Sequence, residues 1–338
     1  VWTPEGVETA VDDPLDADVF CARYGVTGDG NFEGKTVLTR SKSAREVADE
    51  FDLPLDDARA RLASAEEQAL AARAERPRPA RDEKVLAGWN GLAISAFAEA
   101  GFVLDDQYTE RAVDALEFVR ERLWEPSSAT LSRRFRDGDV AIDGYLEDYA
   151  FLARGALDCY QSTGEVRHLA FALDLGRALV DAFWDAERGT LYFTSEGGEA
   201  LIARPQELTD QSTPSSAGVA AQVLLALDAV APDEEFASVA ERVVETHAAT
   251  LESKPLQHAT LVCAAETLSL GVLELTVVGD ALPEAWRAAL SERYLPDALV
   301  ARRPADDDTV ADWLDALAVD EVPPVWADRG GEAPTAYV

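Results

Sequence analysis

The sequence predicts an all-α protein of stacked helical hairpins with short β pieces. The middle of the chain holds two helical patterns followed by an extended piece that begins at a Trp, and the same order then recurs. In both copies a Leu follows that Trp by seven positions, Leu131 after Trp124 and Leu191 after Trp184. Units of about 55 to 70 residues built from paired helices are typical of hairpins that each bury one face against the next.

The first 80 residues are predicted to form a helical segment that ends in a connector. Four helices are expected there, over residues 4–11, 16–24, 43–51 and 54–75. Pro54 favours the start of the last one, because a proline suits the first turn of a helix. The run Arg76-Pro77-Arg78-Pro79 predicts a stiff connector, since each proline restricts the residue before it. We therefore expect a segment over 1–80 and a hairpin array over 81–338 within one structural domain.

Three helical hairpins are predicted after this connector. Their helices are expected over residues 89–101 and 107–123, 145–163 and 166–183, and 214 to about 231 and 236–251. Pro214 is expected to open the third hairpin with Thr213 as its cap. The first helix of each hairpin is apolar almost all round and is expected to be the inner one, whereas the second carries more charge. Beyond the hairpins, a strand is expected over 272–279 and a helix over 283–293.

The chain is strongly acidic. Its 338 residues carry a formal net charge of −34 that is spread along the whole length, and 47% of them are hydrophobic, which is enough for a buried core. Nucleic acids and anionic membrane surfaces need a basic footprint, so neither is expected as a partner. Few lysines stand beside many arginines, and this composition looks like that of a haloarchaeal protein. An acidic protein from a mesophile is the alternative.

The three cysteines, Cys21, Cys159 and Cys263, lie far apart among apolar residues and form no CxxC pair. This pattern predicts buried free thiols in a reducing compartment and no thiolate metal site. The sequence also lacks metal-ligand spacing and a phosphate-binding glycine loop, so no metal or cofactor is expected. We see no signal peptide and no apolar run long enough to span a membrane, which predicts a cytoplasmic protein.

Three polar segments each lead into an apolar helix. They are residues 81–92, 143–150 and 210–216. Inner helices of successive hairpins run parallel and present equivalent ends, so these segments are expected to converge on one cavity despite their distance in sequence. The side chains expected to line it are Asn90, one of Glu147 and Asp148, and Asp210 or Gln211.

Carboxylates in these segments are the candidate catalytic groups. The set is Asp82, Glu147, Asp148 and Asp210. Cleavage of a glycosidic bond needs two carboxylates, about 5 to 5.5 Å apart for retention or about 6.5 to 9.5 Å apart for inversion. Because Glu147 and Asp148 are adjacent, their side chains diverge by about 100° on a helix, and only one is expected to face the cavity.

Helix capping is the alternative role for the same carboxylates. Asp143 is then the cap of the helix through Tyr149, and Glu147 completes a capping box with Gly144. Asp210 braces a turn before Pro214. These structural roles and the catalytic ones are both left open by the sequence.

The candidate substrate-binding residues are Lys84, Trp89, Asn90, Asp143, Tyr145, Tyr149, Gln211 and Ser215. An aromatic face suits the apolar face of a pyranose, although aromatics at helical spacing also fit a core. Asn90 is hard to place in a core, because an unpartnered buried amide costs about 1 to 3 kcal/mol. Lys84 fits either a surface ion pair with Asp82 or an anion contact, and Gly88 and Gly91 fit a close approach of two helices.

Four segments together resemble the thioredoxin-domain-containing family that includes spermatogenesis-associated protein 20. They are Arg81 to Leu92, Asp143 to Ala150, Asp210 to Ala220 and Thr335-Ala336-Tyr337-Val338. The likeness extends to Val1-Trp2-Thr3-Pro4-Glu5 and Gly30-Asn31-Phe32-Glu33-Gly34. It implies an (α/α)6 toroid of the six-hairpin glycosidase type behind a thioredoxin-like domain. That domain and the first hairpins are not in this sequence, so we expect the C-terminal portion of a longer protein, with an incomplete toroid.

The resemblance implies two functions for this portion. We favour a non-catalytic scaffold or carbohydrate-binding module that serves the thioredoxin-like domain of the same protein, with a sugar or polyol as ligand. The alternative is a carbohydrate-directed hydrolase or isomerase with paired carboxylates in the toroid bore. The related N-acylglucosamine 2-epimerases use histidines in the bore, whereas His168, His247 and His258 fall in expected outer helices or loops. An epimerase mechanism is therefore poorly supported.

The dispersed acidity generates a prediction about salt. The melting temperature of the chain should rise steeply from dilute buffer to molar KCl, because the Debye length falls to about 3 Å at about 1 M salt and screens the self-repulsion. Thermal unfolding followed by circular dichroism across a KCl series measures this. A melting temperature that stays flat across the series contradicts the halophilic interpretation.

Overall fold

The chain forms two compact units, Val1–Asp82 and Glu83–Val338, and each buries its own hydrophobic core. The computed structural model describes residues 1–197, 203–279, 281–295 and 298–338. Within these ranges, none of the helices combines the length and the apolarity that a membrane crossing requires.

The first unit confirms the four predicted helices. They are α1 (Pro4–Ala10), α2 (Pro14–Tyr24), α3 (Ala44–Glu50) and α4 (Leu55–Ala74). Local capping explains three of the starts: Thr3 and Asp13 accept bonds from the first turns of α1 and α2, and Ser43 forms a capping box with α3. Trp2 anchors the core of this unit, with its ring against Phe20.

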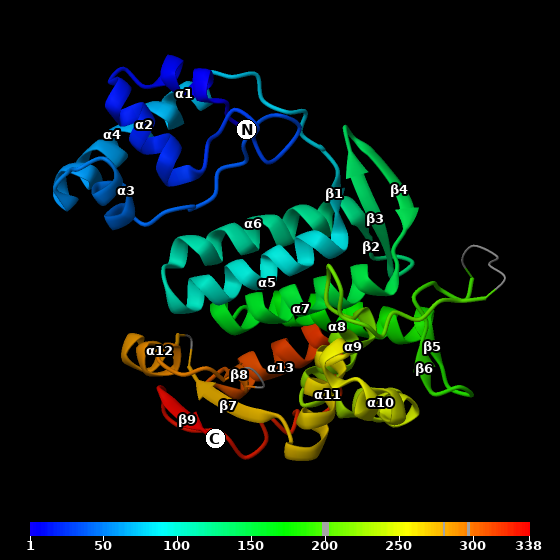
Figure 1. The fold of residues 1–338 in the computed structure, drawn as a ribbon. Helices are drawn as coiled ribbons and strands as arrows, with labels where there is room; N and C mark the ends of the chain where they lie inside the picture. The colour runs from blue at the N-terminus through cyan, green and yellow to red at the C-terminus, as the bar shows by residue number, and fades with distance from the viewer. Residues whose placement is uncertain (198–202, 280, 296–297) are drawn as a thin grey trace. The chain divides into compact units, whose positions relative to one another are not determined.

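The second unit confirms the predicted stack of helical hairpins (Figure 1). Its hairpins are α5 (Ala87–Val103) with α6 (Asp106–Leu123), α7 (Leu146–Thr163) with α8 (Val166–Phe183), and α9 (Ser216–Asp228) with α10 (Phe236–Ser253). A further helix that the sequence did not reveal, α11 (Ala259–Leu270), packs on α9. The inner helices α5, α7, α9 and α11 contact one another in that order, and α6, α8 and α10 lie outside them, as expected for a sector of an (α/α) array.

The inner helices α5 and α7 run parallel at very short range. Gly88 lies against Asp148, Gly91 against Phe151 and Leu152, and Ser95 bonds to Asp158. Residue numbers therefore increase in the same direction along both helices. A Cβ atom at Gly91 would sit 2.4 Å from the carbonyl carbon of Phe151. The interpretation of these glycines as sites of close helix approach is therefore confirmed.

The two Trp-led pieces are short antiparallel ladders. They are β2 (Trp124–Glu125) with β3 (Thr130–Arg136), and β5 (Trp184–Asp185) with β6 (Thr190–Leu191). The Trp and the Leu seven positions later are cross-strand partners in both, Trp124 with Leu131 and Trp184 with Leu191. This pairing is the physical reason for the constant spacing. Two strands that were not predicted, β1 (Val85–Leu86) and β4 (Asp139–Asp143), add to β3.

The C-terminal part is a small α/β layer that the sequence predicted only at its start. The predicted strand and helix are β7 (Leu273–Val278) and α12 (Glu284–Ser291). The elements missed are β8 (Ala298–Arg303), α13 (Asp307–Leu317) and β9 (Thr335–Tyr337). β8 runs parallel to β7 while β9 is antiparallel to it, and Tyr160 of α7 bonds to both backbone groups of Arg302 in β8.

Two local expectations are wrong. Helix α9 begins at Ser216 with Ser215 as its cap, rather than at Pro214 with Thr213, because the Ser215 hydroxyl accepts the amide of Gly218. The cysteines are also not uniformly buried. Cys159 is buried and its pKa is raised by burial to about 12, but Cys21 is half-buried and Cys263 is exposed on α11.

The contact of α5 with α7 predicts that Gly91→Ala destabilises the second unit. The added methyl group meets helix backbone, which cannot rotate away, so we expect a loss of about 1 to 3 kcal/mol or more in the free energy of unfolding. Gly197→Ala is the matched control, because nothing lies within 4 Å of a Cβ atom there, and its effect should stay within about 0.5 kcal/mol. Equal effects of the two substitutions in denaturant unfolding contradict the close-packed interpretation.

Candidate functional site

Carboxylates join the N-terminal ends of the inner helices. Asp148, in the first turn of α7, accepts the amide of Gly88 in α5 at 2.8 Å and the amide of Tyr145 at 3.0 Å. It also accepts a bond from the guanidinium group of Arg133 in β3 at 2.8 Å. Its side chain is only 1% exposed. Asp148 therefore fixes α5, α7 and β3 to one another at a single point.

Glu147 binds the same guanidinium nitrogen, and the expectation that only one of Glu147 and Asp148 faces the cavity stays a prediction. Arg133 Nη1 lies 2.6 Å from Glu147 Oε1 and 2.8 Å from Asp148 Oδ2. Although the two residues diverge at the backbone, the Arg133 side chain reaches both carboxylates from the neighbouring strand. Burial lowers the pKa of Arg133, but the two carboxylates reverse that effect and the net direction is upward.

The capping roles are distributed differently from the prediction. Tyr145 is the residue before α7, and its amide bonds to Asp148 in a capping box. Asp143 does not cap this helix, because it is exposed and pairs with Ser132 across strands β4 and β3. Glu147 forms no box with Gly144, since its carboxylate is drawn to Arg133.

Asp210 repeats the same arrangement at the next pair of inner helices. Its carboxylate accepts the amide of Ser215 at 2.8 Å and the amide of Thr260 at 3.0 Å, and the Thr260 hydroxyl also bonds to it. It thus joins the starts of α9 and α11. Burial raises the pKa of Asp210, but the bonds from Thr260, Ser215 and Ala259 outweigh it and hold the pKa below the ordinary value.

Glu207 is a carboxylate of this region that the sequence analysis missed. It lies in the loop before α9, where its backbone carbonyl accepts the Ser215 hydroxyl at 2.8 Å. Burial raises the pKa of Glu207, the nearby Glu147 carboxylate raises it further, and Arg133 lowers it. No motif marks this loop position in the sequence, because only the folded chain brings it beside Glu147.

The aromatic candidates separate into one exposed ring, one partly covered ring and one buried ring. Trp89, in the first turn of α5, is 61% exposed. The Tyr145 ring lies between the Arg133 guanidinium, 5.0 Å from its centroid, and the ring of Phe193. Tyr149 is buried and its hydroxyl accepts the Leu131 amide, so the expectation that it offers a stacking face is wrong.

The remaining candidates are bonded within the fold or exposed at the surface. The Asn90 amide donates to the carbonyl of Leu86 at 2.8 Å, one turn earlier, which satisfies it without a ligand. Lys84 is exposed, and Asp82 is exposed at the end of the first unit. Gln211 is exposed, and its backbone N–H donates to the carbonyl of Thr213. Ser215 is buried in its capping role.

A pocket of about 200 Å³ lies in the loop before α9. It is lined by Gln206, Glu207, Leu208, Thr209, Gln211, Ser212, Thr213 and Pro214. Gln211 and the missed Glu207 share this pocket, whereas Asn90 and Glu147 are not among its lining residues. The polar entries of α7, α9 and α11 are thus at one end of the array, but the single shared cavity remains a prediction.

The histidines lie on outer helices or before α11, as the sequence suggested, and only His258 adjoins this site, through Leu208 of the pocket lining. His168 is buried on α8, where burial lowers its pKa to about 4. His247 on α10 bonds to Thr190, and His258 bonds to the carbonyl of Leu208 before α11. Among the described residues, no group of three or more His, Cys, Asp or Glu side chains is placed to hold a metal ion.

The chain is similar in sequence to spermatogenesis-associated protein 20. It is 28% identical to the human protein over 309 residues, which cover 83% of this chain and 39% of the human protein. It is 27% identical to the rat protein over 329 residues, covering 88% and 42%, and 31% identical to the mouse protein over 256 residues, covering 67% and 32%. The chain therefore spans about two fifths of the length of the human and rat relatives. No protein-family model matches it.

Two solved structures are also similar, both of inactive variants of the alpha-1,6-mannanase GH76A of Salegentibacter sp. HEL1_6. The complex with alpha-1,6-mannotriose is 15% identical, covers 72% of this chain and 69% of that chain, and gives a TM-score of 0.39. The complex with alpha-1,6-mannotetrose is 15% identical, covers 81% of each chain, and gives a TM-score of 0.43.

The bonding of Asp210 predicts that Asp210→Asn changes the free energy of unfolding by an amount that depends on pH. Ser215 and Thr260 donate their N–H groups to different oxygens of Asp210, and Asn replaces one of these oxygens with an NH2 group that cannot accept. One of the two bonds is therefore lost, and we expect the free energy of unfolding to fall by about 1 to 2 kcal/mol at neutral pH. The pKa of Asp210 is lowered from 3.8 on folding, so its contribution is complete above that value and is lost as the pH falls through the folded pKa. The difference from wild type should therefore shrink below about pH 4.

Asp181→Asn is the control, because Asp181 is exposed on α8. It should change the free energy of unfolding by less than about 0.5 kcal/mol at either pH. Urea unfolding of the three proteins at neutral and acidic pH measures these differences. An Asp210→Asn effect of the same size at both pH values contradicts the assignment.

Proposed function

We propose that the unit Glu83–Val338 is a non-catalytic scaffold and a binding module for a carbohydrate or polyol, within a longer protein. The observation that supports this most is the use of the two inner carboxylates. Asp148 and Asp210 each accept amides from the starts of two helices, so their oxygens are occupied by the fold. A carboxylate held in this way is poorly suited to donate or remove a proton during a reaction.

Exposed polar and aromatic groups at the same end of the array support the binding role. Trp89 offers its ring face beside the point where α5 and α7 meet, and an aromatic face of this kind suits the apolar side of a sugar ring. Gln211 and Glu207 offer hydrogen-bonding groups in the nearby pocket. The thioredoxin-like domain expected from the family resemblance is the proposed intramolecular partner of the scaffold.

One observation favours a second candidate, a carbohydrate-directed hydrolase. Glu147 is paired with Arg133 at 2.6 Å, while burial and the nearby Glu147 charge raise the pKa of Glu207. A carboxyl group with a raised pKa near a second carboxylate is the usual acid in the carboxyl pair of glycoside cleavage. In this candidate, Glu147 and Glu207 act, and Asp148 and Asp210 only position the helices.

Trp89→Ala is expected to weaken sugar binding by about tenfold, since loss of one stacking ring removes about 1 to 1.5 kcal/mol. The assay is isothermal titration of the protein with a panel of mono- and oligosaccharides and polyols, including α-1,6-linked manno-oligosaccharides. Trp89→Phe should retain most of the affinity, and Leu270→Ala is a control because Leu270 is also exposed, at the end of α11. Saturable binding that all three variants leave unchanged contradicts the binding site at Trp89.

The same panel, followed for reducing sugar release, separates the two candidates. The binding module predicts no turnover by the wild-type protein. Turnover that Glu147→Gln and Glu207→Gln each lower by at least about a hundredfold would support the hydrolase and overturn the non-catalytic proposal.

A further inference from the structure

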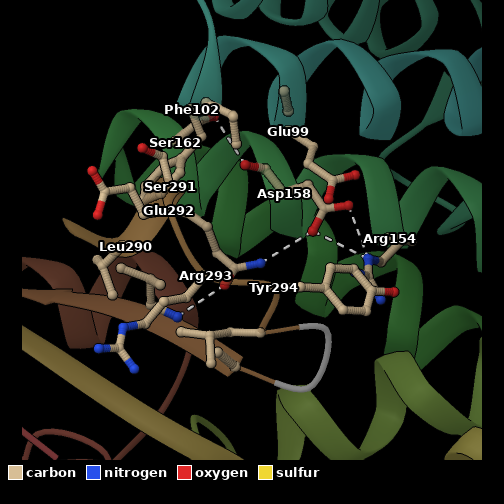
Figure 2. A pocket seen from close by; sticks show the side chains of 16 residues that line it. Glu99, Phe102, Arg154, Asp158, Ser162, Leu290, Ser291, Glu292, Arg293 and Tyr294 are labelled. Carbon is tan, nitrogen blue, oxygen red and sulfur yellow. Dashed lines mark hydrogen bonds and ion pairs between the residues drawn. The ribbon is translucent and has the colours of Figure 1, made fainter. Parts of the chain in front are cut away.

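A second and larger pocket lies at the opposite end of the inner helices from the carboxylate network. Its volume is about 370 Å³, within the range of pockets that hold small molecules. The C-terminal halves of α5 and α7 form one wall, and the end of α12 with the start of β8 forms the other (Figure 2). All of its lining residues belong to the second unit.

The α7 side of this pocket is a preorganised polar wall. Asp158 is buried there, and its carboxylate accepts bonds from Arg154 at 2.9 Å, from Gln161 at 3.1 Å and from Ser95 at 2.5 Å. Gln161 in turn accepts the amide of Val300 in β8 at 2.9 Å, so the two walls are bonded together. These bonds fix Asp158 and Arg154 in place before any ligand arrives.

The remaining walls are largely apolar. Phe102 and Val103 of α5, Leu290 of α12 and Val300 of β8 line the interior, and Leu295 lies at the loop that follows α12. Figure 2 shows the Glu99 and Asp158 carboxylates and Arg154 on one side of the pocket, with Leu290 on the other. A ligand that fills this space therefore meets apolar side chains along its body and charged groups from both walls, because Glu292 and Arg293 follow α12.

The balance of charge among the lining residues determines which end group is favoured. Three carboxylates, those of Glu99, Asp158 and Glu292, stand against the two guanidinium groups of Arg154 and Arg293. Asp158 is neutralised by Arg154, whereas the side chains of Glu99, Glu292 and Arg293 have no hydrogen-bond or ion-pair partner among the described residues. The lining therefore carries one excess negative charge, and Glu99 stands on the wall of Asp158 while Arg293 stands on the wall of Leu290 (Figure 2).

We propose that this pocket binds an organic monocation with an apolar body, such as an arylalkyl amine, and that Glu99 contacts the ammonium group. The apolar walls supply most of the affinity through burial, and Glu99 supplies the preference for positive charge. This site is independent of the sugar-binding proposal, because the two lie at opposite ends of α5 and α7.

Three probes of matched shape test the proposal: 4-phenylbutylamine, 4-phenylbutan-1-ol and 4-phenylbutyrate. Isothermal titration at one fixed salt concentration, the lowest that keeps the chain folded, should show saturable binding with the amine at least about tenfold tighter than the carboxylate. Glu99→Gln should weaken the amine by about fivefold and leave the alcohol unchanged.

Two further variants make the result specific. Glu110→Gln removes the same charge from an exposed position on α6 and should leave the amine affinity unchanged, which excludes a general effect of the acidic chain. Leu290→Ala should weaken all three probes alike, because it removes apolar wall and no charge. Absence of saturable binding, equal affinity for amine and carboxylate, or equal effects of Glu99→Gln and Glu110→Gln overturns the proposal.

Discussion

The arrangement of the second unit depends on the bonds that Asp148 makes. An α-helix leaves its first amides without partners, and two parallel helices that start side by side leave two such sets in the same place. Asp148 provides an acceptor to both sets, because it accepts the amide of Gly88 in α5 and the amide of Tyr145 before α7. The Arg133 guanidinium balances the buried charge and attaches β3 to the same point.

The same bonding arrangement recurs at the next pair of inner helices, where Asp210 joins the starts of α9 and α11. Parallel inner helices therefore place acidic residues at one end for a structural reason, and a cluster of carboxylates there is not by itself a sign of catalysis. The groups that remain available are those outside the network, chiefly the exposed ring of Trp89 and the Glu207 carboxyl. These available groups are the reason why we propose binding, rather than catalysis, as the first function of this end of the unit.

Periodic features could be predicted from the sequence, and features that depend on distant contacts could not. The helices of the three hairpins, their inner or outer position and the Trp124–Leu131 ladder follow from local patterns, whereas α11 and α13 were missed. Strand β8 was missed; it ends in Arg302 and Arg303, which are buried in the fold although arginine is usually exposed. The sequence marked Glu147 and Asp148 as candidate carboxylates, but it did not reveal their bonds to Arg133, a residue of the extended piece that no helical pattern connects with them.

Native-state hydrogen exchange at the amide of Gly88 tests the central role of Asp148 most directly. Asp148→Ala removes the acceptor of that amide, so its exchange should accelerate by about 5- to 30-fold, beyond any change at the Gly164 amide at the far end of α7. Glu147→Ala removes the neighbouring carboxylate without touching that bond and should leave Gly88 unchanged. Exchange at Gly88 that responds equally to both substitutions, or to neither, would contradict the account.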